Sequence, residues 1–425
     1  MKIKQPKFSF TLAGRQKISF LSGSGLAQIQ EKIYIKTMHL DHLSLENFRN
    51  HGKLELDFNH GQRINYFIGP NAFGKTNILE AIYLLALTKS FRAAGLDDLI
   101  GWNCEYARVK GSLNSADDDT DIGDASELEV FLGNPPHPKK SLKKNGVKTT
   151  AENFIGNCKV VLFTPEDLNL LYLGPDLRRR YLDILNLQVK RDYYSALRNY
   201  KKTLEQRNSL LRLIKDGRAR SAELDLWDEK LAEYGSKIIL ERAKTVGFFH
   251  EKLQEKYRQI SQNREAMSVE YKCSGAPLLG SGTQNLSLGE IQTAFTQKLG
   301  QNRTRDLEAG ITTSGPHRDD LVFSLEGRNL VQHASRGEYR SIVLAMKILE
   351  MEYHAQISGT RPIVLLDDVF SELDDNRRSM LVSAIQHHQI FITSTKIGDH
   401  FIERTHKSLA EHAKEPNIFR VGVEG

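Results

Sequence analysis

Apolar and polar positions follow different patterns in successive stretches of the chain. The runs INYFI (64–68) and IVLL (363–366) are short and continuously apolar, as in buried strands. The segment NILEAIYLLAL (77–87) has apolar positions at helical spacing and contains no helix breaker. From Leu40 to about Leu132 the pattern is otherwise rich in strands. Together these patterns predict an α/β domain.

A long stretch of helical character follows. No proline occurs between Pro175 and Pro277, and Leu, Arg, Lys, Glu and Gln recur there at helical spacing. Gly217 lies in a polar break, so we predict two or more antiparallel helices that form an arm inserted into the α/β domain. Beyond the arm, the pattern predicts a strand within 319–327 and a long helix over 337–356.

The first 37 residues differ from the rest. The part before Glu31 carries five cations and no acid, and the apolar centre ISFL is too short for a signal peptide. The composition allows a mitochondrial transit peptide, whereas the plainer interpretation is a flexible extension or an upstream start. We therefore divide the chain into an extension (1–37), the first part of the α/β domain (38–174), the helical arm (175–277) and the second part of the domain (278–425).

The predicted strand at 64–68 and the predicted helix at 77–87 flank a segment of the form G-x-x-x-x-G-K-T. In a P-loop, the glycines let the backbone fold closely around phosphates, and the helix N-terminus supplies N–H donors. Lys75 would reach the β- and γ-phosphates of ATP, and the Thr76 hydroxyl would hold Mg²⁺. An ordinary glycine turn is the alternative, which this strand–loop–helix context disfavours. The predicted ATP-binding residues of the loop are Gly69, Pro70, Asn71, Ala72, Phe73, Gly74, Lys75 and Thr76.

A second half of a nucleotide site is predicted at the end of the apolar run 363–366. Asp367 would bind Mg²⁺ directly or through water, as a Walker B acid does. Asp368 would orient and activate the attacking water, which makes it the candidate catalytic residue beside Lys75. The alternative is that both acids merely cap a strand-to-helix turn.

ABC-type ATPases also carry a Ser-x-Gly signature that opens a long helix shortly before Walker B. Two stretches compete here, Ser287-x-Gly289 and Ser335-x-Gly337. We choose Ser335 and Gly337 because they open the predicted helix at the right distance from Asp367. The signature acts on the γ-phosphate held by another subunit, so a complete site requires two chains in a symmetric homodimer.

Composition narrows the function further. The net charge is +6 and the sequence pI is about 8.9, which permits a nucleic-acid partner without establishing one. The three cysteines are scattered, no C-x-x-C pair occurs and no apolar run approaches a membrane span, which fits the reducing cytoplasm.

Cations cluster at the start of the arm. Two interpretations remain open for them, contacts to DNA phosphates and helix-surface cations paired with acids. The candidate DNA-binding residues are Arg178, Arg179, Arg180, Lys201 and Lys202.

Two polar loops have simpler explanations. The acidic segment 114–127 lacks the Gly and Glu that a calcium-binding EF-hand loop requires, so we interpret it as a solvated connection between hairpin strands. The basic turn PKKSLKKNGVK (138–148) carries Asn145-Gly146 at its tip, which predicts a hairpin.

At this point the chain resembles the RecF family, bacterial ABC-type ATPases of recombinational repair that are related to the heads of SMC proteins. The resemblance runs from about Met38 to the C-terminus. It rests on the P-loop and on five further blocks, namely LDHLSLENFRN (40–50), FTPEDLNLLYLGPDLRRRYLD (163–183), TSGPHRDDL (313–321), ASRGEYRS (334–341) and LLDDVFSELDDNRRSML (365–381). The implied fold is an ABC-type ATPase head with an inserted helical arm.

The resemblance also implies a function. RecF-like proteins bind ATP and Mg²⁺, form an ATP-dependent homodimer, and bind single- and double-stranded DNA without reading its sequence. They act at gaps and stalled forks and help to load RecA with RecO and RecR, and weak DNA-stimulated ATP hydrolysis times their release. By the same resemblance, Arg49 lies near the nucleotide phosphates. Asp374, the D-loop acid, lies across the dimer from the partner's P-loop.

The sequence departs from the family pattern at several positions. Ala72 and Leu173 stand where glycine is usual, and Arg336 and Glu338 stand near usual glutamines. Ala72 would constrain the loop, and Glu338 would bring a negative charge towards the γ-phosphate held by the partner.

Two other classes of protein are weighed against this one. An SMC-like ATPase that bridges DNA would need long coiled coils, whereas the predicted arm is short and lacks sustained heptads. A metabolic P-loop kinase would need a small-molecule acceptor site and would not explain Ser335-x-Gly337 or the basic arm.

Overall fold

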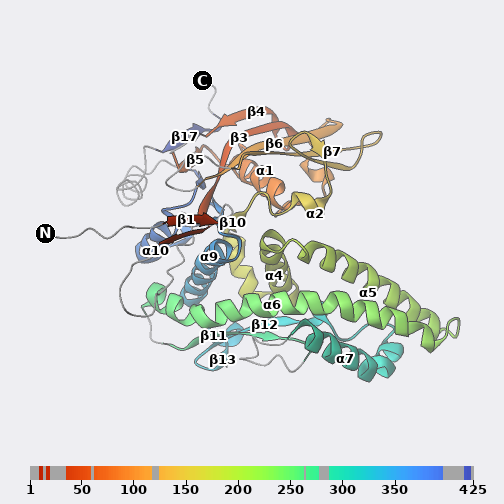
Figure 1. The fold of residues 1–425 in the computed structure, drawn as a ribbon. Coiled ribbons are helices and arrows are strands. Elements are labelled where there is room, and N and C mark those ends of the chain that lie inside the picture. The colour runs from red at the N-terminus through yellow and green to blue at the C-terminus, as the bar shows by residue number, and fades with distance from the viewer. Residues whose placement is uncertain are drawn as a thin grey trace.

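The computed structural model describes residues 9–12, 16–19, 35–58, 62–116, 124–262, 265–276, 287–395 and 416–422. A head rich in strands carries β5 and α1, and long helices lie beneath it as an arm (Figure 1). The predicted α/β fold with a helical arm is therefore confirmed. In the described part of the chain, no helix combines the length and the apolar character needed to cross a membrane. The predicted extension 1–37 lies mostly outside the described residues.

A parallel sheet forms the nucleotide-facing half of the head. Its order is β10 (Val160–Phe163), β15 (Ile363–Asp367), β16 (Ile390–Ser394), β5 (Ile64–Ile68) and β17 (Asn417–Arg420). All four pairings are parallel, so the carboxyl ends of strands from distant parts of the sequence meet at one edge. Ligands of open α/β sheets bind at this edge.

A second sheet covers the other side of α1 (Lys75–Leu87). Its order is β14 (Thr360–Arg361), β3 (Lys36–Phe48), β6 (Tyr106–Ala116), β7 (Ser126–Gly133), β8 (Lys140–Lys144) and β9 (Val147–Lys148), with β4 (His51–Asp57) also paired to β3. Eleven of the 13 residues of α1 are buried, because the helix packs with strands of both sheets in one apolar cluster. The P-loop helix is thus held from two sides.

Both predicted hairpins are present. Asn145 and Gly146 have φ of 52° and 76° between β8 and β9, the left-handed pair that a tight turn requires. The acidic segment connects β6 to β7, which pair antiparallel. Its residues 117–123 lie outside the described part of the chain.

The arm consists of α4 (Pro175–Val189), α5 (Tyr193–Lys215), α6 (Leu224–Ser261) and α7 (Leu288–Ala309). The predicted break is present, and Gly217 has φ of 71° between α5 and α6. Two features differ from the predicted arm at 175–277. The segment contains a strand, β11 (Met267–Lys272), which pairs antiparallel with β12 (Asp320–Leu325). The arm also includes α7, which begins after 277 and packs against α5 and α6 through Phe295.

The remaining helices and strands include the long helix α9. They are β1 (Ser9–Leu12), β2 (Gln16–Ser19), α2 (Ala151–Phe154), α3 (Asn169–Tyr172), β13 (Arg328–Asn329), α8 (Leu330–His333), α9 (Arg336–Ser358) and α10 (Asp375–Ile385). Helix α9 matches the long helix predicted over 337–356. Its buried face shares one core with α4, α6, β5 and β15, so head and arm are not separate apolar units.

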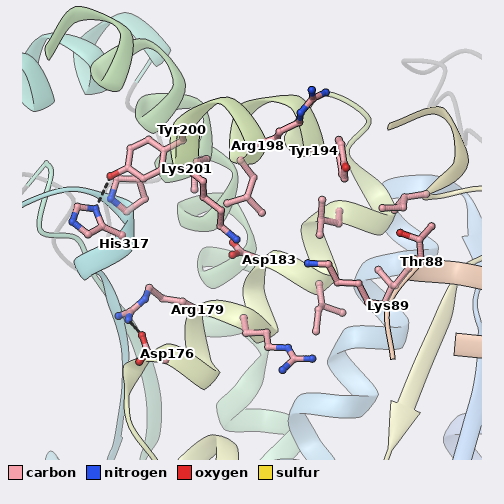
Figure 2. A pocket seen from close by; sticks show the side chains of 18 of the residues that line it. Thr88, Lys89, Asp176, Arg179, Asp183, Tyr194, Arg198, Tyr200, Lys201 and His317 are labelled. Carbon is pink, nitrogen blue, oxygen red and sulfur yellow. Dashed lines mark hydrogen bonds and ion pairs between the residues drawn. The ribbon is translucent and has the colours of Figure 1, made fainter. Parts of the chain in front are cut away.

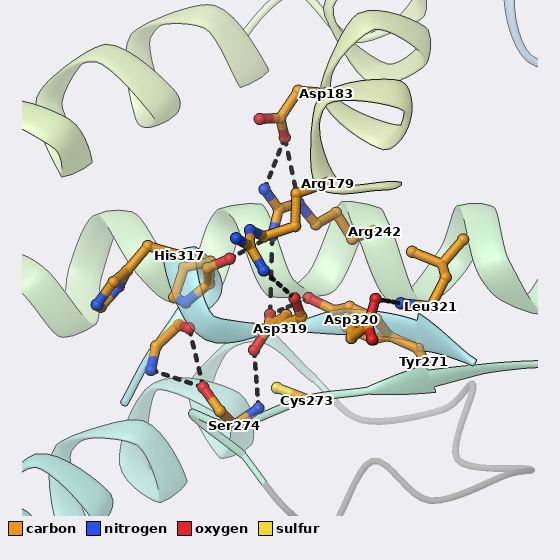
Figure 3. A network of polar contacts seen from close by, with 12 residues as sticks. Arg179, Asp183, Arg242, Tyr271, Cys273, Ser274, His317, Asp319, Asp320 and Leu321 are labelled. Carbon is orange, nitrogen blue, oxygen red and sulfur yellow. Dashed lines mark hydrogen bonds and ion pairs between the residues drawn. The ribbon is translucent and has the colours of Figure 1, made fainter. Parts of the chain in front are cut away.

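The segment 313–321 holds elements of the arm together through a network of polar contacts (Figure 3). The Asp319 carboxylate accepts hydrogen bonds from the Ser274 backbone N–H at 2.7 Å and from the Tyr271 hydroxyl. The buried Arg242 guanidinium donates to the Pro316 carbonyl at 2.6 Å and to Asp183 at 2.8 Å. Burial raises the pKa of Asp319, and the nearby Arg242 opposes that rise. This sequence block therefore joins α4, α6 and β11.

Candidate functional site

The P-loop leads from the fully buried strand β5 directly into α1. Gly74 precedes the helix with φ of 96°, and Ala72 has φ of 70°. Both angles lie in the left-handed region, which lets the loop turn back tightly between strand and helix. Ala72 adopts this conformation without being glycine, so the departure from the family pattern is accommodated with some backbone strain.

Other segments of the chain also approach both glycines of the motif closely. A Cβ on Gly69 would collide with the carbonyl oxygen of Val421, which follows β17. A Cβ on Gly74 would lie 2.5 Å from Asn50 Oδ1 and 2.6 Å from His51 Nε2. The loop is therefore shaped by segments near both ends of the chain as well as by its own sequence.

Lys75 is held close to the loop. Its ammonium donates to the carbonyl oxygens of Gly69 at 2.7 Å and Pro70 at 2.6 Å, and only 8% of the residue is exposed. Burial lowers the pKa of Lys75, and the carboxylates of Asp368 and Asp367 oppose that shift. The cation therefore lies within the loop that it is predicted to serve.

The two predicted magnesium ligands meet directly. The Thr76 hydroxyl donates to Asp367 Oδ1 at 2.8 Å, although 291 residues separate them in the sequence. The same oxygen accepts a hydrogen bond from Thr393 Oγ1 at 2.7 Å. A hydroxyl and a carboxylate side by side are the oxygen ligands that Mg²⁺ prefers, so these residues fit a magnesium ion held beside a nucleotide.

Asp368 follows immediately and has φ of 52°, a left-handed conformation that is uncommon for aspartate. Its backbone N–H donates to Thr393 Oγ1 at 3.1 Å. Thr393 thus fixes both acids of the pair by bonding the side chain of one and the backbone of the other. Its position could have been found from the run IFITS, an apolar strand that ends in hydroxyls.

These groups surround a cavity of about 420 Å³ at the carboxyl edge of the parallel sheet. The sequence predicted much of its lining, including Lys75 and Asp368. Arg92, Glu166 and Thr393 also line it and were missed. Glu166 belongs to the block 163–183, so the resemblance marked its neighbourhood without giving it a role.

Arg49 does not line this cavity. Its guanidinium forms two 2.8 Å hydrogen bonds with the buried Glu80 carboxylate on α1, and a third with the Asp98 carbonyl. The pairing with Glu80 raises the pKa of Arg49. Arg49 lines a neighbouring hollow of about 550 Å³ that shares Asn77 and Arg92 with the phosphate cavity. It therefore fastens the P-loop helix and lies next to the cavity.

The predicted signature lies on a separate surface. Ser335 caps α9, and its Oγ accepts from the Glu338 N–H at 3.3 Å while the Glu338 carboxylate accepts from the Ser335 N–H at 2.5 Å. This reciprocal cap engages the charge of Glu338 within its own chain. Ser335 is exposed, and neither it nor Gly337 lines the phosphate cavity.

Asp374, the predicted D-loop acid, is joined to this surface by an arginine that the sequence did not single out. Arg377 donates to the Gly337 carbonyl at 2.8 Å and pairs with Asp374, which also caps α10. The competing Ser287 caps α7 in the same reciprocal way, but that helix packs within the arm. The geometry therefore favours Ser335 and Gly337 as the signature.

The candidate DNA contacts do not share one environment. Arg178 is buried and forms a two-pronged ion pair with Asp320, Nε to Oδ1 at 2.6 Å and Nη2 to Oδ2 at 3.0 Å. The predicted contact of Arg178 with DNA phosphate is wrong, because its buried guanidinium ties α4 to β12. Arg179 is half-buried and bonded to Asp176 and the Asp319 carbonyl. The exposed candidates are Arg180, Lys201 and Lys202, which face a large hollow between head and arm.

Comparison with known proteins agrees with this architecture. The family model described as RecF/RecN/SMC N terminal domain matches residues 39–412. The DNA replication and repair protein RecF of Natranaerobius thermophilus is 38% identical over 364 residues, which cover 85% of this chain and 92% of that protein. The protein of the same name from Streptococcus uberis is 37% identical over 384 residues, covering 90% and 99%.

Solved structures give the same result. The recombination mediator protein RecF-ATPrS in the RecFOR pathway has a TM-score of 0.79 and 32% identity, covering 91% of this chain and 97% of its own. The corresponding RecF-ATP structure has a TM-score of 0.76 and 34% identity, covering 86% and 94%. The chain thus belongs to the RecF family of DNA replication and repair proteins, which are SMC-like ABC-type ATPases.

Proposed function

We propose that this protein is an ATP-gated DNA-binding protein of recombinational repair. The observation that carries the proposal is the 2.8 Å hydrogen bond from Thr76 to Asp367, which brings P-loop and Walker B together at one cavity. The structures of relatives described as RecF-ATP and RecF-ATPrS support ATP as the nucleotide. Mg²⁺, held by Thr76 and Asp367, would neutralise charge on the phosphates.

The proposed chemistry follows from the positions of the side chains. Lys75 donates to the Gly69 and Pro70 carbonyls of its own loop, and it would exchange these bonds for bonds to the β- and γ-phosphates. Asp368 would accept a hydrogen bond from the attacking water and orient it towards the γ-phosphate. Hydrolysis is expected to be slow, because its task is to time release.

The dimer is proposed because each chain carries two separated halves of a site. Ser335, Gly337 and Asp374 are exposed or half-buried on a surface away from the phosphate cavity, linked by Arg377. A two-fold pairing would place the signature of each chain against the phosphates held by Gly74, Lys75 and Thr76 of the other. The γ-phosphate would then be shared, and its loss would open the dimer.

Sedimentation with saturating ATP and Mg²⁺ tests this arrangement. Asp368→Asn is expected to bind ATP, lose water activation and remain dimeric, whereas Ser335→Arg is expected to bind ATP as a monomer. Ser287→Arg, the matched change at the other cap, is the control and is expected to dimerise normally. If Ser335→Arg dimerises like the wild type while Ser287→Arg does not, the signature lies on the arm.

DNA is the proposed partner, both single- and double-stranded and without sequence preference. Arg180, Lys201 and Lys202 supply exposed charge, and these candidate contacts are Lys and Arg side chains without a groove-reading motif. Affinity is therefore expected to fall steeply with salt, by a slope of about 0.7–0.9 per phosphate contact. A strong preference for one sequence at fixed salt would contradict the proposal.

The biological setting is proposed from the relatives. A relative's structure is described within the RecFOR pathway, which supports RecO and RecR as partners at gaps and stalled forks, where RecA is loaded. The SMC-like bridging alternative gains no support from the arm, because its longest helix spans only 38 residues and packs along its whole length in the fold.

A further inference from the structure

A large hollow lies between the head and the arm, apart from the phosphate cavity (Figure 2). Its volume is about 1020 Å³, and its walls come from the end of α1 and the loop after it, from β8, and from α4, α5 and α6. In Figure 2 the Lys89 side chain of the head points across the hollow towards Lys201 and Asp183 of the arm. The residues placed in the ATPase chemistry, Lys75, Thr76, Asp367 and Asp368, do not line this hollow.

The hollow is lined by an excess of cations. Eight Lys and Arg side chains and three carboxylates line it, so the walls repel one another unless an anion enters. Two of the cations, Lys89 and Lys140, come from the head, and the others come from the arm. Within the described part of the chain, the side chains of Lys89, Arg180 and Lys201 form no hydrogen bond or ion pair. Desolvation and then the charges of Lys201 and Arg180 lower the pKa of Lys89.

The three carboxylates do not neutralise this excess. Asp183 is bonded to Arg242 at 2.8 Å and to the Tyr193 hydroxyl at 2.5 Å, and Asp176 is paired with Arg179. Glu205 is the third, on the exposed side of α5. Two of the acids therefore already have their own cations, and Lys89, Lys140, Arg180 and Lys201 remain without matching negative charge. Lys140 donates only weakly, to Thr88 at 3.3 Å.

The walls between the cations are apolar and include an aromatic ring. Half-buried Tyr194 and Leu197 of α5 face the hollow with Leu96 and Ile155 of the head. Alternating cations and an accessible aromatic ring are the combination by which proteins hold single-stranded nucleic acid, with phosphates on the charges and bases stacked on the rings. A duplex keeps its bases inside and is too wide to enter a hollow of this volume.

We propose that this hollow holds a short single-stranded DNA segment. The phosphates lie against Lys89, Lys140, Arg180 and Lys201, and a base stacks on Tyr194. The inference rests on the proposed DNA-binding function and specifies a site for it, in which the head contributes Lys89 and Lys140. A strand held there contacts the head directly after the P-loop helix α1 and contacts the arm at the same time.

The test uses the full-length protein with ATP and Mg²⁺, a fluorescent oligo-dT and a duplex of the same length. The variant Lys89→Ala/Lys201→Ala is compared with Lys53→Ala/Lys272→Ala, which removes the same charge from exposed strand positions outside the hollow. Thermal midpoints of both variants verify folding. The expected result is at least a tenfold loss of oligo-dT affinity for the first variant only, with a salt slope reduced by about 1.4. Duplex affinity should fall by a clearly smaller factor, because Lys201 is shared with the proposed duplex contacts whereas Lys89 is not.

A second measurement locates the base. Oligo-dT that contains 5-iododeoxyuridine is irradiated, and the cross-linked peptide is expected to contain Tyr194 and to disappear in Tyr194→Ala. Equal losses for oligo-dT and duplex would overturn the single-strand assignment, and unchanged oligo-dT affinity would overturn the site while leaving DNA binding intact. If the wild type binds neither DNA, the proposed function itself fails.

Discussion

The head and the arm both contain many charged residues, but they use them in opposite ways. In the head, Lys75, Asp367 and Asp368 surround an open cavity, where their charges can be met by a ligand. In the arm, Arg207 is completely buried and bonded to Asp228 at 2.6 Å and Asp306 at 2.7 Å. The arm thus satisfies its central charges internally, whereas the head leaves its own for phosphate and metal.

This difference shows why the number of arginines in a segment does not measure its binding surface. Arg178, Arg207 and Arg242 of the arm are buried and paired with acids. A buried pair adds little net stability, but breaking it leaves a charge without its partner. These buried arm charges should therefore affect folding, and the charges that line the phosphate cavity of the head should affect ligand binding.

The substitution with the largest expected effect is Arg207→Ala, which tests whether the buried charges of the arm stabilise the fold. It leaves the buried carboxylates of Asp228 and Asp306 without this partner, and we expect a loss of about 3–5 kcal/mol in the free energy of unfolding. Urea titration measures it. Arg212→Ala, an exposed position on the same helix, is the control and should cost less than about 1 kcal/mol. Equal effects of the two changes would show that the buried network is unimportant.

The corresponding change in the head is Lys75→Ala. It removes the cation that can reach the β- and γ-phosphates, and we expect ATP affinity to fall at least about 100-fold, or about 2.7 kcal/mol, in calorimetric titration. The thermal midpoint without nucleotide should change little. Unchanged ATP affinity in this variant would remove the basis for the P-loop assignment.

A buried histidine on α9, between the two regions, gives a pH-dependent prediction. Burial lowers the pKa of His354 to about 3, and neither ring nitrogen has a hydrogen-bond partner in the described structure. The unfolded chain binds this proton below about pH 6.5 and the folded chain does not, so stability falls as the pH drops from 7 to 5. We expect His354→Leu to reduce that fall by on the order of 1–2 kcal/mol.

Urea titrations at pH 7 and pH 5 measure the difference. Burial also lowers the pKa of His388, to about 4. The pH dependence of stability should therefore be weaker in His354→Leu than in the wild type, but it should not disappear. An identical pH dependence in wild type and His354→Leu would mean that His354 is protonated in the folded state.

The smallest expected effect concerns strain in the P-loop. Ala72→Gly removes the strain of a φ of 70° in the folded state but increases the conformational entropy of the unfolded chain. The two effects oppose each other, so the free energy of unfolding should change by less than about 1 kcal/mol. Ala94→Gly, in a nearby loop without a positive φ, should destabilise by about 0.5–1 kcal/mol. Thermal midpoints compare them. A larger loss for Ala72→Gly than for Ala94→Gly would show that the loop is not strained.

The sequence by itself determined the local parts of this molecule. The apolar runs gave β5 and β15, helical spacing gave α1 and α9, and Asn145-Gly146 gave its hairpin, because each depends on neighbouring residues only. The G-x-x-x-x-G-K-T motif likewise carries its own turn and helix start, so Lys75 and Thr76 were identified without a fold.

The tertiary structure decided everything that depends on contacts between distant segments. The hydrogen bond of Thr76 to Asp367, the role of Thr393 beside it and the burial of Arg178 against Asp320 join residues that are far apart in the sequence. The strand β11 lies inside the stretch predicted as helical; its residues MSVEYK alternate apolar and polar as a half-buried strand does, and its pairing with β12 decides in favour of the strand. Burial and charge pairing are set by packing, so the sequence could list the cations of the arm but could not say which of them reach the surface.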